Sequence, residues 1–497
     1  MPSSGRPPDT SVTRTAGPAV ARRHDLDALR AAAMTAGLVV HATSPMIPYW
    51  AADDPAGGLL YRLHELLHGF RMPLFFLLSG FFTTMLLHRR GLGGLLAHRC
   101  RRIVVPFALS LVTILPLVIV GLALARVLIG TDSGLTEPFS AIYGARIELI
   151  DTGAGWEPVV TPPPFSGVRL AHLWFLWQLI LILAVTALVA EAGARLRRRH
   201  PPEPQRADAE RSGPTGDTTG TAPVLGRMAW LAVPATIVFE AGMTPDLFGP
   251  DTSEELLPNP LVLGYYGAFF AFGALAHRPI RPGRPPLIDA TARLWPLQLL
   301  AGLAVYPVER LLPPSSLLAP TAQALYAWLL IFGTMGLARW LVKTARPWIR
   351  WVSDSAYWVY LIHLPILVVM SGVVARLQLP GLVAFPLVMA MVMALSFGSY
   401  QVVRPSPVGT LLHGPRPRSP RCRRSIGHRR THSPIDLSAF LPPATDERRH
   451  RPSSVTTNDQ VACGRQVRNT SYGAGASSRR QPRSDCPARH RSARPGS

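Results

Sequence analysis

A stripe of polar side chains runs along an otherwise apolar segment near the start of the sequence. The stretch LDALRAAAMTAGLVVHA, residues 26–42, contains Asp27, Arg30 and His41. At about 100° of turn per residue, the eleven-residue step from Arg30 to His41 returns to nearly the same helix face, and Asp27 lies one turn before Arg30. A neutral imidazole on such a stripe can accept a proton from a hydroxyl group. The alternative is a histidine that only bonds a neighbouring helix.

A pair of arginines follows in the segment HRCRRIVVPF, residues 98–107. Arg99 and Arg102 are three residues apart, so one side of a helix start presents both guanidinium groups. Planar guanidinium groups bind phosphate through parallel hydrogen bonds, which makes the pair a candidate phosphate site. The alternative is that both arginines reach to the membrane surface as ordinary cytoplasmic charges.

Two further apolar segments contain isolated polar residues. FRMPLFFLLSGFF, residues 70–82, places Arg71 near its start, where the side chain binds a ligand or reaches lipid headgroups. SDSAYWVYLIHLP, residues 353–365, has a polar residue at every third position, namely Asp354, Tyr357, Tyr360 and His363. This stripe indicates either a second buried histidine with a function or a hydrogen-bonded packing seam.

The elements that must position these residues are membrane helices. Ten apolar stretches reach the length of about 17–25 residues that a bilayer crossing requires. They lie at residues 26–47, 66–87, 103–129, 172–192, 226–243, 261–277, 294–312, 321–341, 351–375 and 382–403. The sequence therefore predicts an all-α, polytopic membrane protein with about ten transmembrane helices in one bundle.

The distribution of positive charge predicts the orientation of this bundle. With a cytoplasmic N-terminus, the connections on the inner side hold 19 Lys and Arg residues, and those on the outer side hold 5. Cytoplasmic connections carry such an excess. We therefore expect a multi-pass protein of the cell (inner or plasma) membrane with both termini in the cytoplasm.

The chain divides into three regions by composition. Residues 1–23 are predicted to be a disordered cytoplasmic N-terminus, residues 24–414 the transmembrane domain, and residues 415–497 a disordered tail. From Arg404 to the end there are 19 Arg against 5 Asp and Glu, and such a basic arm binds nucleic acid at most non-specifically. The four cysteines and the histidines lack the spacing of metal ligands, so no metal site is predicted.

Taken in order, these motifs resemble one family. The run from LDALRAAAMTAGLVVHA through FRMPLFFLLSGFF, HRCRRIVVPF, HLWFLW and SDSAYWVYLIHLP to SFGSYQVVRPSPVGTLLHG resembles the acyltransferase family 3 membrane proteins. Within that family it is similar to the branch that includes the glucan biosynthesis protein C. The resemblance covers residues 24–414. HLWFLW, which begins at His172, is also typical of an interfacial anchor.

The resemblance implies an integral-membrane O-acyltransferase without a permanently bound cofactor. It would take an acetyl or succinyl group from cytoplasmic acyl-coenzyme A, as co-substrate, and pass it to a hydroxyl of a cell-envelope or exported carbohydrate. It implies His41 as general base or acyl relay. The other residues that it indicates are Arg30, Arg99 and Arg102 for the coenzyme A phosphates or the thioester carbonyl, Arg71 and His363 for acceptor or oxyanion contacts, and Asp27 and Tyr360 as supporting residues.

A secondary transporter or flippase for a polar lipid or sugar is the alternative. It would use the same intramembrane Arg and His side chains as a substrate pathway. Transporters often show paired broken helices or an internal repeat, and neither is visible in this sequence.

Overall fold

A computed structural model gives the fold. It describes residues 23–44, 54–130, 146–151, 156–161, 168–199, 221–243, 248–278, 285–313, 316–344 and 346–413. All of them belong to one compact unit, Met1–Ser419. The predicted disordered tail, residues 415–497, and all but the last residue of the predicted disordered N-terminus lie outside the described residues.

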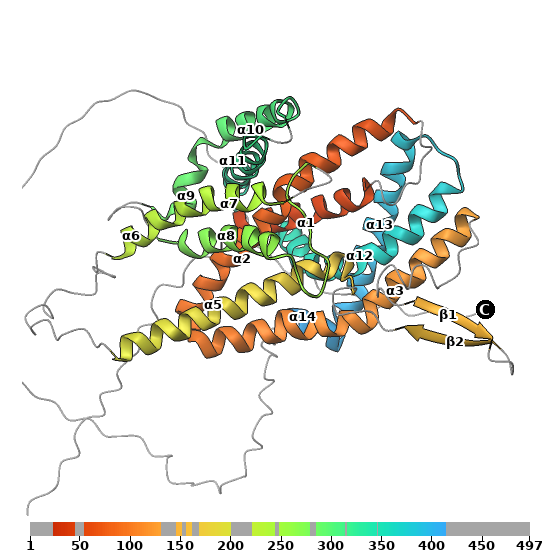
Figure 1. Cartoon of the computed structure of the whole chain (residues 1–497), viewed down its shortest axis with the longest axis horizontal. Coiled ribbons are helices and arrows are strands. Elements are labelled where there is room, and N and C mark those ends of the chain that lie inside the picture. Colours follow the sequence, from red (N-terminus) through yellow and green to blue (C-terminus); the bar gives the residue numbers. More distant parts are fainter. Residues whose placement is uncertain are drawn as a thin grey trace, which may run out of the picture. The chain divides into compact units, whose positions relative to one another are not determined.

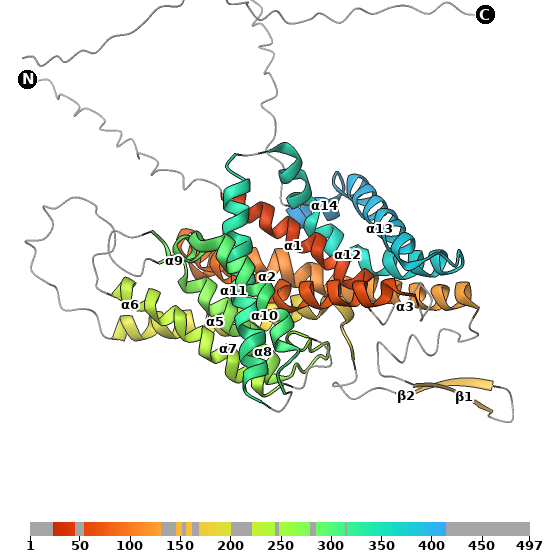
Figure 2. The same ribbon diagram turned by 90° about the horizontal axis from the view of Figure 1, so that it is seen from above.

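The described part of the chain is almost entirely helical, which confirms the all-α expectation (Figures 1 and 2). The helices are α1 (His24–Ala42), α2 (Ala56–Arg99), α3 (Val105–Ile129), α5 (Trp174–Arg199), α6 (Thr221–Met228), α7 (Ala232–Ala241), α8 (Pro260–Leu275), α9 (Leu287–Thr291), α10 (Trp295–Glu309), α11 (Leu318–Leu341), α12 (Pro347–Ala375), α13 (Gly381–Val403) and α14 (Pro407–His413). A π-helix, η1 (Cys100–Val104), joins α2 to α3, and the 3-10 helices η3 (Ala171–Leu173), η5 (Ala229–Leu231) and η6 (Ala292–Leu294) precede α5, α7 and α10.

The protein is a multi-pass membrane protein, but the count of ten crossings is not confirmed. Within the described residues, six helical segments are long and apolar enough to span a bilayer. They are Ala56–Ile129, Ala171–Leu196, Val224–Ala241, Leu318–Leu341, Pro347–Ala375 and Gly381–Val403. The first has 74 residues and covers two of the predicted spans. The remaining predicted spans fall on α1, which carries three charged side chains, and on α8 and α10, which have 16 and 15 residues.

Regular structure occurs within predicted connections. Residues 88–102, expected to be a cytoplasmic connection, are helical except at Gly91, where φ is 67°. Glycine adopts this positive φ without a steric penalty, and the leucines, alanine and arginines around it favour helix. The predicted outer connection at 130–171 contains two antiparallel strands, β1 (Arg146–Asp151) and β2 (Trp156–Thr161). No strand was predicted here from the sequence.

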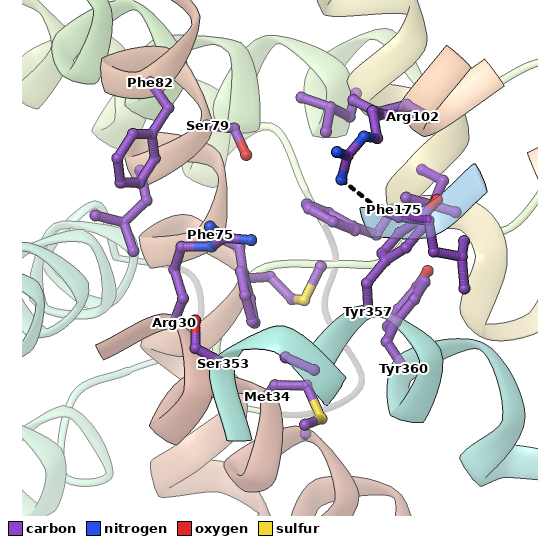
Figure 3. A pocket seen from close by; sticks show the side chains of 18 of the residues that line it. Arg30, Met34, Phe75, Ser79, Phe82, Arg102, Phe175, Ser353, Tyr357 and Tyr360 are labelled. Carbon is purple, nitrogen blue, oxygen red and sulfur yellow. Dashed lines mark hydrogen bonds between the residues drawn. The ribbon is translucent and has the colours of Figure 1, made fainter. Parts of the chain in front are cut away.

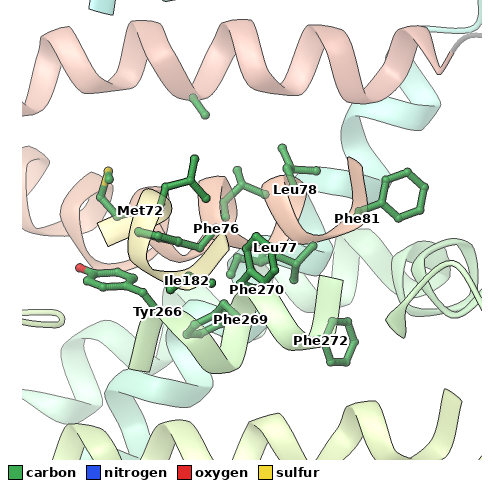
Figure 4. Packing of buried hydrophobic residues seen from close by; sticks show 14 of the residues in the cluster. Met72, Phe76, Leu77, Leu78, Phe81, Ile182, Tyr266, Phe269, Phe270 and Phe272 are labelled. Carbon is green, nitrogen blue, oxygen red and sulfur yellow. The ribbon is translucent and has the colours of Figure 1, made fainter. Parts of the chain in front are cut away.

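The core begins where α2 crosses α8. A Cβ atom on Gly80 would lie 2.0 Å from the carbonyl oxygen of Phe270, and one on Gly273 would lie 1.9 Å from that of Leu77. The absence of both side chains lets the two backbones touch, which is the usual role of small residues between membrane helices. Phe76 and Phe269 are completely buried in the surrounding cluster (Figure 4). This contact fixes α2, which carries two of the predicted site residues, Arg71 and Arg99.

Helix α1 lies against α2, α11 and α12, so its polar stripe has helices on more than one side. Its apolar residues Leu26 and Leu38 are buried. The imidazole Nδ1 of His64 in α2 bonds the carbonyl oxygen of Val40 at 2.9 Å, which ties the two helices together near the end of α1.

The start of α1 is held by an ionic cluster. Arg23 donates through Nη2 to Asp25 at 2.8 Å and to Asp289, before α10, at 2.9 Å. The guanidinium of Arg339, at the end of α11, lies 2.6 Å from the same Asp289 carboxylate. The hydrogen bond to Asp25 raises the pKa of Arg23 above its ordinary value. Two segments distant in sequence, α9 and α11, therefore fix where α1 begins.

Candidate functional site

One cavity of about 470 Å³ lies among α1, α2, η1, α5 and α12 (Figure 3). Its wall contains all eight site residues that the sequence predicted, which are Asp27, Arg30, His41, Arg71, Arg99, Arg102, Tyr360 and His363. They come from segments up to more than 300 residues apart in the chain. The fold therefore gathers the predicted residues around one space, with the arginines Arg30, Arg99 and Arg102 at a basic end and His41 at a histidine end.

The basic end is built around the π-helix η1. Arg99 is the last residue of α2 and donates through Nη2 to Oγ1 of Thr83 at 2.7 Å. Its Nε atom is buried and has no hydrogen-bond partner among the described residues. Arg102 lies within η1 and donates through Nη1 to the carbonyl oxygen of Leu412 in α14. Short π-helical turns inside α-helices are rare and frequently occur at functional sites.

Arg30 completes the basic end from the opposite wall. Its guanidinium carbon lies 5.7 Å from the centroid of the Phe82 ring, a cation–π distance (Figure 3). Arg30, Arg99 and Arg102 thus direct three permanent positive charges at one end of the cavity. Such a group of guanidinium donors matches a phosphorylated ligand.

The histidine end brings Arg71 next to the stripe of α1. A Cβ atom on Gly37 would lie 2.5 Å from Nη1 of Arg71, so the guanidinium lies on the α1 backbone one turn before His41. The Arg71 side chain is 8% exposed, and its Nε has no hydrogen-bond partner within the described ranges. No carboxylate among the described residues forms an ion pair with it. Because a buried unpaired cation is costly, this arrangement favours binding of an anionic group.

Two more histidines face His41 at this end. The ring centroid of His363 lies 5.1 Å from that of His41 and 5.2 Å from that of His172. His363 donates through Nδ1 to the carbonyl oxygen of Tyr360 at 2.7 Å, and His172 donates through Nε2 to that of Leu361 at 3.1 Å. A carbonyl only accepts, so these bonds assign the tautomers and leave a lone pair on Nε2 of His363 and on Nδ1 of His172. Both nitrogens are buried without a partner among the described residues.

His172 is the functional candidate that the sequence analysis did not assign. It begins the segment HLWFLW, for which an interfacial anchor was one interpretation, yet it is 3% exposed and lines the cavity. The Tyr360 hydroxyl donates to the His172 carbonyl oxygen at 2.6 Å, so α12 and η3 hold each other in register. The presence of HLWFLW among the motifs in family order was the signal that could have identified this residue.

The two ends of the cavity are far enough apart for an extended ligand. Arg30 and His41 are separated by eleven residues of one helix, a rise of about 16 Å at 1.5 Å per residue. A molecule with phosphates at the basic end and a flexible arm along α1 would bring its far end to His41 and Arg71. An imidazole and a guanidinium at that point can attack or deprotonate a reactant and stabilise a developing oxyanion.

Comparison with known protein families agrees with this chemistry. A family model described as an acyltransferase domain, Acyl_transf_3, matches residues 23–401. That range contains α1 to α12 and every predicted site residue. No curated protein and no solved structure matches the chain.

Proposed function

This chain belongs to acyltransferase family 3, and we propose that it transfers an acetyl or succinyl group from cytoplasmic acyl-coenzyme A to a carbohydrate hydroxyl. It is an acyltransferase of groups other than aminoacyl groups. The cavity that joins the basic end to His41 is the observation that carries the proposal. An acyl-coenzyme A has the shape and charge for it, with phosphates at one end and a thioester at the end of a long arm.

The basic end is the proposed binding site for the acyl donor, acyl-coenzyme A. Arg30, Arg99 and Arg102 would bind the phosphates of coenzyme A, because guanidinium groups form paired hydrogen bonds with phosphate oxygens. The cytoplasmic side is the expected side of this end, since the connections near it are rich in arginine. Asp27 lines the same part of the cavity and would position the arginine side chains.

The histidine end supplies the proposed chemistry. His41 would act on the thioester, as a general base or as an acyl relay. Arg71 lies one turn away and would stabilise the negative charge that develops on the carbonyl oxygen. The side chains at this end have little contact with bulk solvent, since Arg71 and His363 are 8% and 2% exposed. Fixed charges act more strongly in such surroundings than in water.

The acceptor is proposed from the motif order. Similarity to the branch of the glucan biosynthesis protein C favours a glucan or another cell-envelope saccharide as acceptor. The expected orientation has both termini in the cytoplasm of a cell-membrane protein. The lone pairs of His172 and His363 can accept hydrogen bonds from sugar hydroxyls.

Thioester chemistry separates this proposal from transport. Purified protein in vesicles is given labelled acetyl- or succinyl-coenzyme A together with an oligoglucan, and thiol release and labelled glucan are measured. We expect both products. A protein that releases no thiol but exchanges a sugar or polar lipid across the vesicle membrane would instead support the secondary transporter or flippase.

The length of the C-terminus gives a first prediction. Ending the chain after Gly414 is expected to leave acyl transfer unchanged, because no described side chain of the cavity is lost. Ending it after Arg404 removes α14 and the Leu412 carbonyl that holds Arg102. We expect the KM for acyl-coenzyme A to rise about 10-fold, because the loss of one hydrogen bond to a charged group has an effect of about this size. Equal KM values for the two truncations would contradict the role of α14.

Gly37 gives a second prediction. In Gly37→Ala the added methyl group collides with Nη1 of Arg71 and displaces the guanidinium. We expect kcat to fall about 10–100-fold, since a shift of about 1 Å in a catalytic group has effects of this size. Gly398→Ala in α13 is the control, because a Cβ atom there meets nothing within 4 Å. A Gly37→Ala protein with the kcat of Gly398→Ala would show that the position of Arg71 is unimportant.

A further inference from the structure

His41 and His363 differ in how their rings are held. The Nδ1 of His363 bonds the carbonyl oxygens of Val359 at 3.1 Å and Tyr360 at 2.7 Å, which fixes the ring and presents Nε2 to the cavity. His41 has a ring contact with His363 but no hydrogen bond on either ring nitrogen to any residue that the structure describes. A general base in an enzyme is ordinarily oriented by a third group bonded to its second nitrogen. Among the residues that the structure describes, His363 meets this condition and His41 does not.

The surroundings of His363 suit a ligand whose hydroxyl group donates a hydrogen bond. The Nε2 lone pair of His363 is buried and has no partner in the described part of the chain, and the same holds for the Nδ1 lone pair of the neighbouring His172. Buried polar atoms normally have partners, and an exception calls for an explanation such as a ligand. Arg71 presents only donors to the same end of the cavity. The ring nitrogens of His363 and His172 can therefore accept a hydrogen bond from a hydroxyl group, and Arg71 can donate one to a carbonyl oxygen.

We propose that His363 is the base that removes the proton of the acceptor hydroxyl, and that His41 is the nucleophile that carries the acyl group. This inference rests on the proposed function and divides its chemistry between two rings. With the ring centroids 5.1 Å apart, a hydroxyl bonded to Nε2 of His363 lies beside an acyl group on His41. No described residue bonds the ring nitrogens of His41, which leaves them available to attack the thioester.

Acyl transfer then takes two steps. A ring nitrogen of His41 attacks the thioester carbonyl carbon, a C–N bond forms and the C–S bond breaks. Coenzyme A leaves as the thiolate, and the intermediate is an acyl-imidazolium. The acceptor oxygen then attacks the acyl carbon while its proton moves to Nε2 of His363. The C–O bond forms, the C–N bond breaks and neutral His41 returns. His363 releases its proton to solvent, and the thiolate takes one up.

The variant His363→Asn separates the two steps. The asparagine amide can still donate to the Tyr360 carbonyl, so the local bond is retained while the Nε2 lone pair is lost. The matched control is His277→Asn in the segment after α8. His277 bonds the carbonyl oxygen of Ala274, three residues earlier, at 2.9 Å in the same way and lies outside the cavity.

Two measurements test the division of roles. The first is exchange of labelled coenzyme A into unlabelled acetyl-coenzyme A without acceptor, which reports acyl transfer to His41. The second is acetylation of methyl glucoside. For His363→Asn we expect exchange within a few-fold of wild type and a loss of transfer of about 10²–10⁴-fold, the usual contribution of a general base. His277→Asn should match wild type in both.

An acceptor that needs no base gives a further readout. Trifluoroethanol loses its proton more readily than a sugar hydroxyl does. Hydroxylamine attacks an acyl carbon more readily than a sugar hydroxyl does. The defect of His363→Asn should therefore shrink at least 10-fold when either replaces methyl glucoside. A purely structural defect would be the same with all three acceptors.

The outcomes distinguish this inference from the function on which it rests. Wild-type protein that transfers the acyl group but shows no exchange without acceptor overturns the role of His41 as nucleophile. A His363→Asn protein that loses exchange as much as transfer, or loses neither, overturns the role of His363. Wild-type protein that releases no thiol from acyl-coenzyme A contradicts the proposed function, and the inference falls with it.

Discussion

Replacing His41 with alanine is expected to abolish acyl transfer and thiol release together. The residual rate should be at least about 10³–10⁴-fold below wild type, as when a single nucleophile or base is removed. The reason is its place in the cavity, next to the rings and the guanidinium that line the histidine end. The measurement is the rate of thiol release and of labelled product at saturating acetyl-coenzyme A.

Binding should survive this substitution. Arg99 and Arg102 lie at the other end of the cavity, so the Kd of coenzyme A should change less than 3-fold in His41→Ala. His68→Ala is the matched control, since His68 bonds the Pro250 carbonyl oxygen at 3.1 Å and is not part of the cavity wall. Thiol release by His41→Ala at the rate of His68→Ala would exclude His41 from the chemistry.

Replacing Arg71 with leucine is expected to lower kcat by about 10²–10³-fold, the usual effect of removing one donor to an oxyanion. The same change should leave the thermal unfolding midpoint unchanged or raise it. Arg71 is 8% exposed and has no described ion-pair partner. Exchanging buried ionic groups for well-packed apolar ones is often neutral or stabilising by about 1–4 kcal/mol. Activity should thus fall without a loss of stability.

The variant Arg71→Lys refines this prediction. Lysine keeps the positive charge but loses the planar fork of donors. We expect a kcat between those of wild type and Arg71→Leu, with a midpoint close to wild type. An Arg71→Leu protein that unfolds more readily and retains its kcat would show that the guanidinium is structural.

Much of the helical architecture follows from hydropathy. The predicted spans coincide with helices because apolar runs of this length can satisfy their backbone groups in lipid only as helices. The pattern could not reveal that residues 88–102 continue α2, because glycines and charges there also suit a connection. The hydropathy pattern also placed the start of this helix at residue 66. In the structure α2 already begins at Ala56, and His64 and Glu65 are buried in its first turns. Glu65 accepts a hydrogen bond from the Tyr306 hydroxyl at 2.8 Å, a partner remote in sequence.

Helix periodicity predicts only the part of the site in which the residues lie on one helix. The return of Arg30 and His41 to one face of α1 follows from helix geometry, and both line the cavity. The approach of Arg71 to Gly37 depends on how α1 and α2 cross, and the contact of His172 with His363 depends on α5 and α12. Such contacts between distant segments leave no periodic mark in a sequence.

The hydrogen bond between Arg102 and Leu412 has a consequence for biosynthesis. The two residues are 310 positions apart, so at about 5–20 residues per second a ribosome needs roughly 15–60 s to make the second after the first. For that interval the early helices, with Arg71 and Arg99, reside in the bilayer without the late helices that enclose them. Until α12 and α14 emerge, these guanidinium groups lack the late residues that line the cavity with them, among them Tyr360, His363 and Leu412.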